Sequence, residues 1–95
     1  MRLRLYSSVA KADMPNLVAL QDEILDGLPT VLVCPFRTDQ KKTVFRVEVN
    51  WDGKTFVACP ELTRPIHRKG LRPLGQLSES ASRAIMHDFF NLLAH

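Results

Sequence analysis

The sequence predicts a mainly β fold of the α+β class: a small antiparallel sheet or SH3-like barrel with one C-terminal helix. Three features of the 95 residues point to it. Short apolar runs rich in β-branched residues recur over the first two thirds of the chain, separated by proline, glycine and polar segments. Residues 44–59 alternate apolar and polar side chains around an Asp-Gly pair, which is typical of a β-hairpin. Apolar side chains recur at helical spacing only after residue 77.

The N-terminal part predicts two strands. Arginines and leucines alternate over residues 2–6, and this period of two predicts a half-buried first strand. Residues 7–14 are mostly small or polar and predict a surface loop, whereas the apolar run 16–20 predicts a buried second strand. The acidic segment 21–27 ends in Asp-Gly and predicts a loop or a single helical turn.

The middle of the chain predicts the central strand and a hairpin. Residues 30–34 are apolar, β-branched and bounded by prolines, so they predict the central strand. Residues 36–43 are charged without an apolar pattern and predict a mobile loop. Residues 44–51 and 54–59 predict the two hairpin strands, and Asp52-Gly53 between them fits a type I′ turn, in which both residues need a positive φ.

The C-terminal part predicts short strands and then a helix. Three prolines and two glycines in residues 60–75 allow short strands near 66–67 and 71 but exclude a helix. Ser78 followed by Glu79 is typical of a helix N-terminus, and the helix is expected to reach the end of the chain.

The predicted helix carries two adjacent apolar stripes. One consists of Ala81, Ile85, Phe89 and Leu92, and the other of Met86, Phe90 and Leu93. Together they make a wider apolar face than a small sheet needs. Two explanations are open: a deeply packed helix, or a homodimer contact formed by Met86, Phe90 and Leu93.

Length and composition limit the classes of function. The 95 residues allow one domain, 1–95. An apolar fraction of 45% and a charged fraction of 24% exclude a disordered chain and a coiled coil. A net charge of +3 does not by itself indicate nucleic-acid binding. No apolar run approaches the ~18 residues of a membrane span, so no membrane partner is expected.

Neither a cofactor nor a metal ion is expected. The four glycines are isolated, so the chain lacks a glycine-rich phosphate loop. Cys34 and Cys59 lie 25 positions apart, without the close spacing of a zinc site. Both lie in apolar runs, and residues 1–6 do not resemble an export signal, so free thiols and a cytoplasmic location are expected.

Two groups of residues are candidates for binding. Residues 63–78 contain no acid and carry Arg64, His67, Arg68, Lys69 and Arg72. Two interpretations are open: the stretch binds phosphates or an acidic protein partner, or it is a solvated loop whose positive charge offsets that of the acidic segment 22–26. Arg37 and Thr38 follow the predicted central strand, where a rigid scaffold can aim an arginine at a phosphate. His67 is the candidate general acid or base for the same chemistry.

Four segments match, in order, those of a known toxin family. Residues 3–7 are similar to its Phe-Lys-Val-Tyr-Thr opening, and residues 17–26 to its apolar strand and the following Val-Gln-Ser-Asp-Ile-Ile-Asp run. Residues 31–36 are similar to a central strand ending in Ile-Pro-Leu, and residues 90–93 to Ile-Asn-Leu-Met in the last helix. Over nearly its whole length the chain thus resembles the CcdB toxins of plasmid toxin–antitoxin pairs, and more distantly the MazF/Kid toxins of the same fold.

The resemblance implies a CcdB/MazF-like fold and a homodimeric, cytoplasmic toxin of a plasmid-maintenance system. In the CcdB family the toxin inhibits a topoisomerase by binding the A subunit of DNA gyrase. The implied target-binding residues are Asn91, Ala94 and His95, and an acidic antitoxin is expected along Arg64, His67, Arg68 and Lys69. The family ends in Trp-Gly-Ile after this helix, whereas here His95 falls where the tryptophan would be and the glycine and isoleucine are missing, so gyrase binding is expected to be weak or lacking.

Two alternatives stay open beside the gyrase hypothesis. A MazF-like endoribonuclease would act on RNA, with Arg37 on the scissile phosphate, Thr38 near the family's catalytic threonine and His67 as proton donor. The family's Arg-Pro at the start of the second strand reads Met14-Pro15 here, so one arginine is missing. The other alternative is a degenerate homologue without toxicity that keeps only the antitoxin-binding or dimer role.

Overall fold

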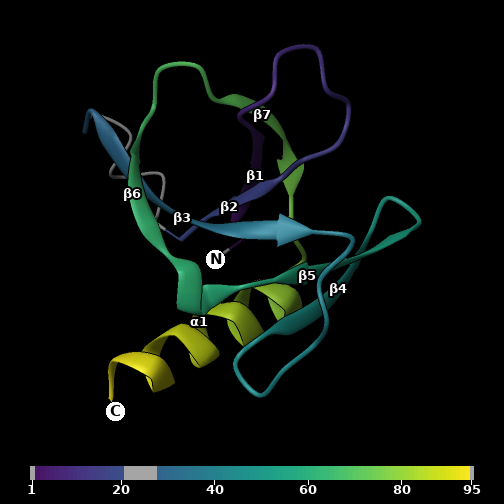
Figure 1. Ribbon diagram of the computed structural model, residues 1–95, viewed down its shortest axis with the longest axis vertical. Helices are drawn as coiled ribbons and strands as arrows, with labels where there is room; N and C mark the ends of the chain where they lie inside the picture. Colours follow the sequence, from purple (N-terminus) through teal and green to yellow (C-terminus); the bar gives the residue numbers. More distant parts are fainter. Residues whose placement is uncertain (1, 21–27, 95) are drawn as a thin grey trace.

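The computed structural model describes residues 2–20 and 28–94 and confirms the predicted fold class, a curled antiparallel sheet with one C-terminal helix (Figure 1). The acidic segment 21–27, predicted as a loop or turn, lies outside the described residues. In chain order the elements are β1 (Arg4–Ser7), β2 (Leu17–Ala19), β3 (Thr30–Arg37), β4 (Val47–Trp51), β5 (Lys54–Ala58), the 3₁₀ turn η2 (Pro60–Leu62), β6 (Arg64–His67), β7 (Arg72–Gln76) and α1 (Glu79–Leu93).

The long strand β3 organises the sheet. The strand order is β4-β5-β3-β2-β1-β7, and β6 also pairs with β3. The first half of β3 pairs with β6, its middle pairs with β2, and its last two residues pair with β5, all antiparallel. Strands β5 and β6 therefore follow one another along the same edge of β3, with η2 between them (Figure 1).

The prediction that the central strand ends at Cys34 is wrong. Strand β3 continues past Pro35 to Arg37. Proline has no N–H to donate, but its carbonyl and the N–H of the next residue still form hydrogen bonds with the segments on the two sides of the strand. The Pro35 carbonyl accepts a hydrogen bond from the Cys59 N–H at 3.0 Å, and the Phe36 N–H donates to the Asn16 carbonyl at 2.9 Å. Phe36 and Arg37 thus belong to a strand and not to the predicted mobile loop.

The predicted hairpin is confirmed, with a later start. Asp52 has a φ of 51° and Gly53 a φ of 75°, as a type I′ turn requires. Strand β4 begins at Val47, three residues later than predicted, and Val44 is 85% exposed. The Arg46 guanidinium instead binds the Glu61 carboxylate of η2 at 2.9 Å, so the segment before β4 is held against η2.

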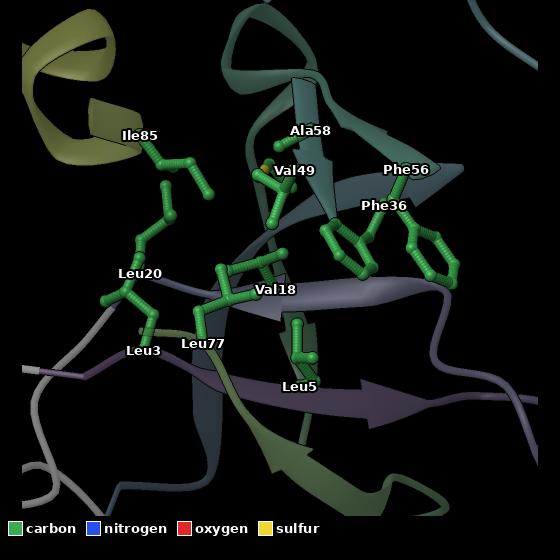
Figure 2. Packing of buried hydrophobic residues seen from close by; sticks show 11 residues of the cluster. Leu3, Leu5, Val18, Leu20, Phe36, Val49, Phe56, Ala58, Leu77 and Ile85 are labelled. Atoms are coloured by element: carbon green, nitrogen blue, oxygen red, sulfur yellow. The ribbon is translucent and has the colours of Figure 1, made fainter. Parts of the chain in front are cut away.

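Both faces of β1, β2 and β3 are buried, because apolar residues alternate between two clusters. The first cluster lies between the sheet and α1 (Figure 2) and consists of Leu3, Leu5, Val18, Leu20, Cys34, Phe36, Val49, Phe56, Ala58, Leu77 and Ile85. The second cluster consists of Tyr6, Leu17, Ala19, Val31 and Val33, with Ile66 and Leu71 packed against it. Strand β6 and the segment that leads to β7 thus cover the face away from the helix.

Helix α1 begins as predicted, and a serine ties it to Leu3, the residue that precedes β1. The Ser78 hydroxyl accepts a hydrogen bond from the Ala81 N–H at 3.2 Å and so caps the helix. The buried Ser82 hydroxyl donates to the Ser78 carbonyl at 2.8 Å and accepts from the Leu3 N–H at 2.9 Å. Ile85 is fully buried against the sheet (Figure 2). The first half of the helix is therefore part of the core.

Candidate functional site

A surface cleft of about 270 Å³ opens where β3 ends beside the segment that leads into β2. It is lined by Met14, Pro15, Asn16, Phe36, Arg37, Thr38, Asp39 and Phe56. The structure thus brings the predicted candidates Arg37 and Thr38 together with Met14-Pro15. This is the pair that was compared above with the Arg-Pro of the MazF/Kid toxins.

Strand register explains why these distant segments meet. Leu17 of β2 pairs with Pro35 of β3 in antiparallel orientation. The residues that precede Leu17 therefore run beside the residues that follow Pro35. The hydrogen bond from the Phe36 N–H to the Asn16 carbonyl, at 2.9 Å, holds the two segments together at the cleft.

The cleft has a rigid apolar floor. The rings of Phe36 and Phe56 stack with centroids 4.3 Å apart and planes 8° from parallel. Figure 2 shows the two rings side by side. Both rings are almost fully buried. A floor of this kind excludes water from one side of a bound group and supports the polar residues above it without moving.

Arg37, Thr38 and Asp39 supply polar groups at the rim of the cleft, and all three are exposed. They combine a cation, a hydroxyl group and a carboxylate within three consecutive residues. Asn16 is already engaged, because its Oδ1 accepts from the Ser8 N–H at 3.0 Å and its Nδ2 donates to the Ser8 hydroxyl at 2.9 Å. The other polar groups at the rim suit an anionic ligand, because the Arg37 guanidinium can bind two of its oxygens.

Lys54 is a cation near this cleft that the sequence did not reveal. Its Nζ lies 3.0 Å from the Sδ of Met14, a residue 40 positions earlier in the chain. The sequence does hold one signal for its side chain. Lys54 and Phe56 are two residues apart in the predicted hairpin strand, so their side chains lie on the same face of that strand. Its proximity to Met14 depends on the folded sheet, and no local pattern encodes it.

The structure does not bring His67 to Arg37. His67 pairs with Thr30 at the first residue of β3, whereas Arg37 is the last residue of that strand. Seven residues of strand span roughly 23 Å. Within one chain, His67 therefore cannot exchange a proton with a group that Arg37 binds, and the two belong to different surfaces.

The basic stretch forms an edge strand and a turn and is not a solvated loop. Arg64 and His67 lie on β6 and are exposed, and Lys69 is exposed in the turn that follows. The Nε of Arg68 donates to the Leu28 carbonyl at 2.7 Å, so this guanidinium has a structural role. Strand β6 therefore presents basic side chains on a fixed backbone along the first half of β3, the half remote from the cleft.

The C-terminal half of α1 separates the predicted dimer residues. Met86 packs against the first core cluster, whereas Phe90 is 58% and Leu93 is 67% exposed. Of the residues predicted for target binding, Asn91 and Ala94 are exposed near the end of the helix, and His95 lies outside the described residues. The packing explanation thus holds for Met86 but leaves Phe90 and Leu93 without a core to cover them.

The two cysteines are free and buried, as predicted. Burial, with a smaller effect of the neighbouring Cys59, raises the pKa of the Cys34 thiol from 9.0 to about 12. Burial also raises the pKa of the Cys59 thiol. Neither thiol is a candidate nucleophile at neutral pH, because the reactive form is the thiolate. Among residues 2–20 and 28–94, no three His, Cys, Asp or Glu side chains are grouped to hold a metal ion, and no helix is long and apolar enough to cross a membrane.

The sequence matches no family model and no curated protein. The fold, however, is similar to that of solved toxins. The Mycobacterium tuberculosis toxin MazF-mt6 superposes with a TM-score of 0.74 at 22% identity, over 99% of this chain and 97% of that one. A chain from the MazE–MazF structure of Deinococcus radiodurans gives a TM-score of 0.74 at 14% identity, over 97% and 89% of the two chains. These similarities confirm the MazF-like fold.

Proposed function

We propose that this chain is the toxin of a toxin–antitoxin pair and that it acts on RNA as a MazF-like endoribonuclease. This ranks the ribonuclease hypothesis above gyrase binding and reverses the order that the sequence favoured. The observation that carries it is the cleft in which Arg37, Thr38 and Asp39 meet Met14 and Pro15. The similarity to two MazF structures over nearly the full chain supports the same choice.

The cleft has groups that would bind the scissile phosphate and take the proton from the attacking hydroxyl group. RNA is cut when a ribose 2′-oxygen attacks the adjacent phosphorus and the bond to the 5′-oxygen breaks. Arg37 binds the phosphate and offsets the negative charge that develops on its oxygens. The Thr38 hydroxyl donates a hydrogen bond to the same phosphate, and the Asp39 carboxylate accepts the proton of the 2′-hydroxyl. A proton returns to the 5′-oxygen from water.

The antitoxin is assigned to a different surface. His67 pairs with the first residue of β3, at the end remote from the cleft, and Arg68 and Lys69 follow it, whereas Arg64 pairs with Val33 in the middle of that strand. An acidic, disordered antitoxin segment that folds on binding would pair with these basic side chains. We also propose a cytoplasmic homodimer formed through Phe90 and Leu93, with Met86 half-buried against the first core cluster.

Gyrase binding remains the second candidate because of one observation. Phe90 and Leu93 expose apolar side chains near Asn91 and Ala94, and an exposed apolar patch marks a protein-binding surface. The same patch serves the proposed dimer. Only one of the two partners can cover it at a time.

Parallel assays of RNA cleavage and gyrase-linked DNA cleavage test the proposal. The purified chain is incubated with total RNA in one arm and with gyrase, ATP and supercoiled plasmid in the other. We expect RNA fragments that carry a 2′,3′-cyclic phosphate and a free 5′-hydroxyl, and no linearised plasmid. Linearised plasmid with intact RNA would instead establish the gyrase hypothesis. If neither RNA fragments nor linearised plasmid form, the result favours the degenerate homologue.

A further inference from the structure

Lys54 does not line the cleft itself, but it places a positive charge beside it, against the lining residue Met14. This lysine is the exposed first residue of β5, and its Nζ lies 3.0 Å from the Sδ of Met14. A thioether sulfur is a weak hydrogen-bond acceptor and carries no charge. This contact therefore positions the ammonium group without neutralising it.

The backbone around Lys54 is fixed, so the position of this charge is built into the fold. Lys54 pairs with Trp51 across the type I′ turn of Asp52 and Gly53, at the closed end of the hairpin. In a strand, residues two apart point to the same face. Phe56, two residues after Lys54, forms part of the cleft floor, so Lys54 leaves β5 on the face that the cleft occupies.

Arg37, which lines the cleft, and Lys54, which contacts its rim at Met14, come from different strands. Arg37 comes from the end of β3, whereas Lys54 comes from the start of β5 and lies on the Met14 side. A cleft with one cation in its lining, at the end of β3, and another just outside it, beside Met14, suits a chain of phosphates better than one isolated anion. Single-stranded RNA is such a chain, and lysine binds phosphate as a point charge that does not require one fixed geometry.

We infer that Lys54 binds an RNA phosphate next to the scissile one, so that Arg37 and Lys54 together hold the backbone across the cleft. The inference rests on the proposed function and specifies the substrate site: Arg37 acts on the reacting phosphate, and Lys54 is a positioning residue that supplies binding. Loss of Lys54 should therefore raise KM and leave kcat within about twofold, because its contact is equal in the ground and transition states.

The test measures binding of a short, fluorescein-labelled RNA of random sequence whose riboses are 2′-O-methylated, so that it cannot be cut. Anisotropy titrations at several KCl concentrations give the slope of log affinity against log salt. One phosphate contact in a single strand contributes about 0.7 to that slope. We expect Lys54→Gln to make it shallower by about 0.7 and Lys54→Arg to restore it. Arg83→Gln removes the same charge from an exposed position on α1 and should leave the slope unchanged.

Each other outcome contradicts the inference in a recognisable way. Tight, salt-dependent binding by the native chain with the same slope in Lys54→Gln would remove Lys54 from the site and leave the proposed function intact. An equal loss in Arg83→Gln would show a general effect of charge and not a site. A native chain that binds no RNA would overturn both the inference and the proposed function.

Discussion

The indole ring of Trp51 lies against Gly75, and through this contact β4 reaches β7. The Trp51 Nε1 donates to the Gln76 carbonyl at 3.2 Å. A Cβ atom on Gly75 would lie 2.8 Å from the Cζ2 of the ring. Because β4 and β7 stand at the two ends of the strand order, this one side chain joins the ends of the curled sheet. It also packs edge-on against Phe56, with ring centroids 6.3 Å apart, and so supports the floor of the cleft.

Gly75→Ala should destabilise the fold by about 1–3 kcal/mol, because a methyl group at this position forces the indole ring away from β7. Urea unfolding followed by circular dichroism measures the free energy of unfolding. In a Trp51→Leu background the same substitution should cost less, since the ring that it displaces is gone. An equal cost in both backgrounds would show that the effect does not come from the Trp51–Gly75 contact.

Local signals account for the parts of the fold that the sequence predicted. The type I′ turn depends on Asp52 and Gly53 alone, and the helix start depends on the Ser78 hydroxyl and the first turn of N–H groups. These signals act over a few residues. They can be recognised in the sequence alone, because they do not depend on how the sheet folds.

Tertiary contacts account for what the sequence did not predict. Strand β3 passes Pro35 because the Asn16 and Cys59 backbones pair with it from two sides. Gly75 lies within β7, although glycine usually weakens strands, because Trp51 needs the space. Of the candidate site, Arg37 and Thr38 were predicted from their place after the expected central strand, whereas the relation of Lys54 to Met14 across 40 positions has no local pattern.

Stability should fall as the pH rises from about 9 towards 12. In that range the unfolded chain loses the Cys34 proton, while burial raises the folded pKa to about 12 and keeps the thiol protonated. Ionisation therefore favours the unfolded state, and the stabilising contribution is complete only at lower pH. In Cys34→Ala the free energy of unfolding should fall less steeply with pH over this range, by up to about 1.4 kcal/mol per pH unit. Parallel pH profiles for the native chain and the variant would contradict this assignment.

The native chain should sediment as a dimer of the 10.8 kDa chain at micromolar concentration. Phe90→Glu with Leu93→Glu should give a folded monomer, because two carboxylates in the apolar patch are costly to desolvate. His87→Glu adds a negative charge at another exposed position of α1 and should leave the dimer unchanged. A native chain that sediments as a monomer would rule out this use of the patch.

Charge reversal on the basic stretch should slow association with the antitoxin. Arg64→Glu with Lys69→Glu should lower the association rate constant roughly tenfold at low salt, and the difference should shrink as salt is added. Arg68 is left unchanged because its guanidinium binds the Leu28 carbonyl. Stopped-flow mixing with the antitoxin gives the rates, and Arg83→Glu is the matched control on α1. If the rate and its salt dependence stay at native values, the antitoxin binds elsewhere.

The central claim is that the cleft at the end of β3 cuts RNA, and the most direct test is the single-turnover cleavage rate of Arg37→Ala beside that of the native chain. Loss of one preorganised charge donor should lower the rate by about 10²–10³, while circular dichroism shows an intact fold. Arg83→Ala, an exposed arginine on α1, should cut RNA at the native rate. Undiminished cleavage by a folded Arg37→Ala variant would contradict the account.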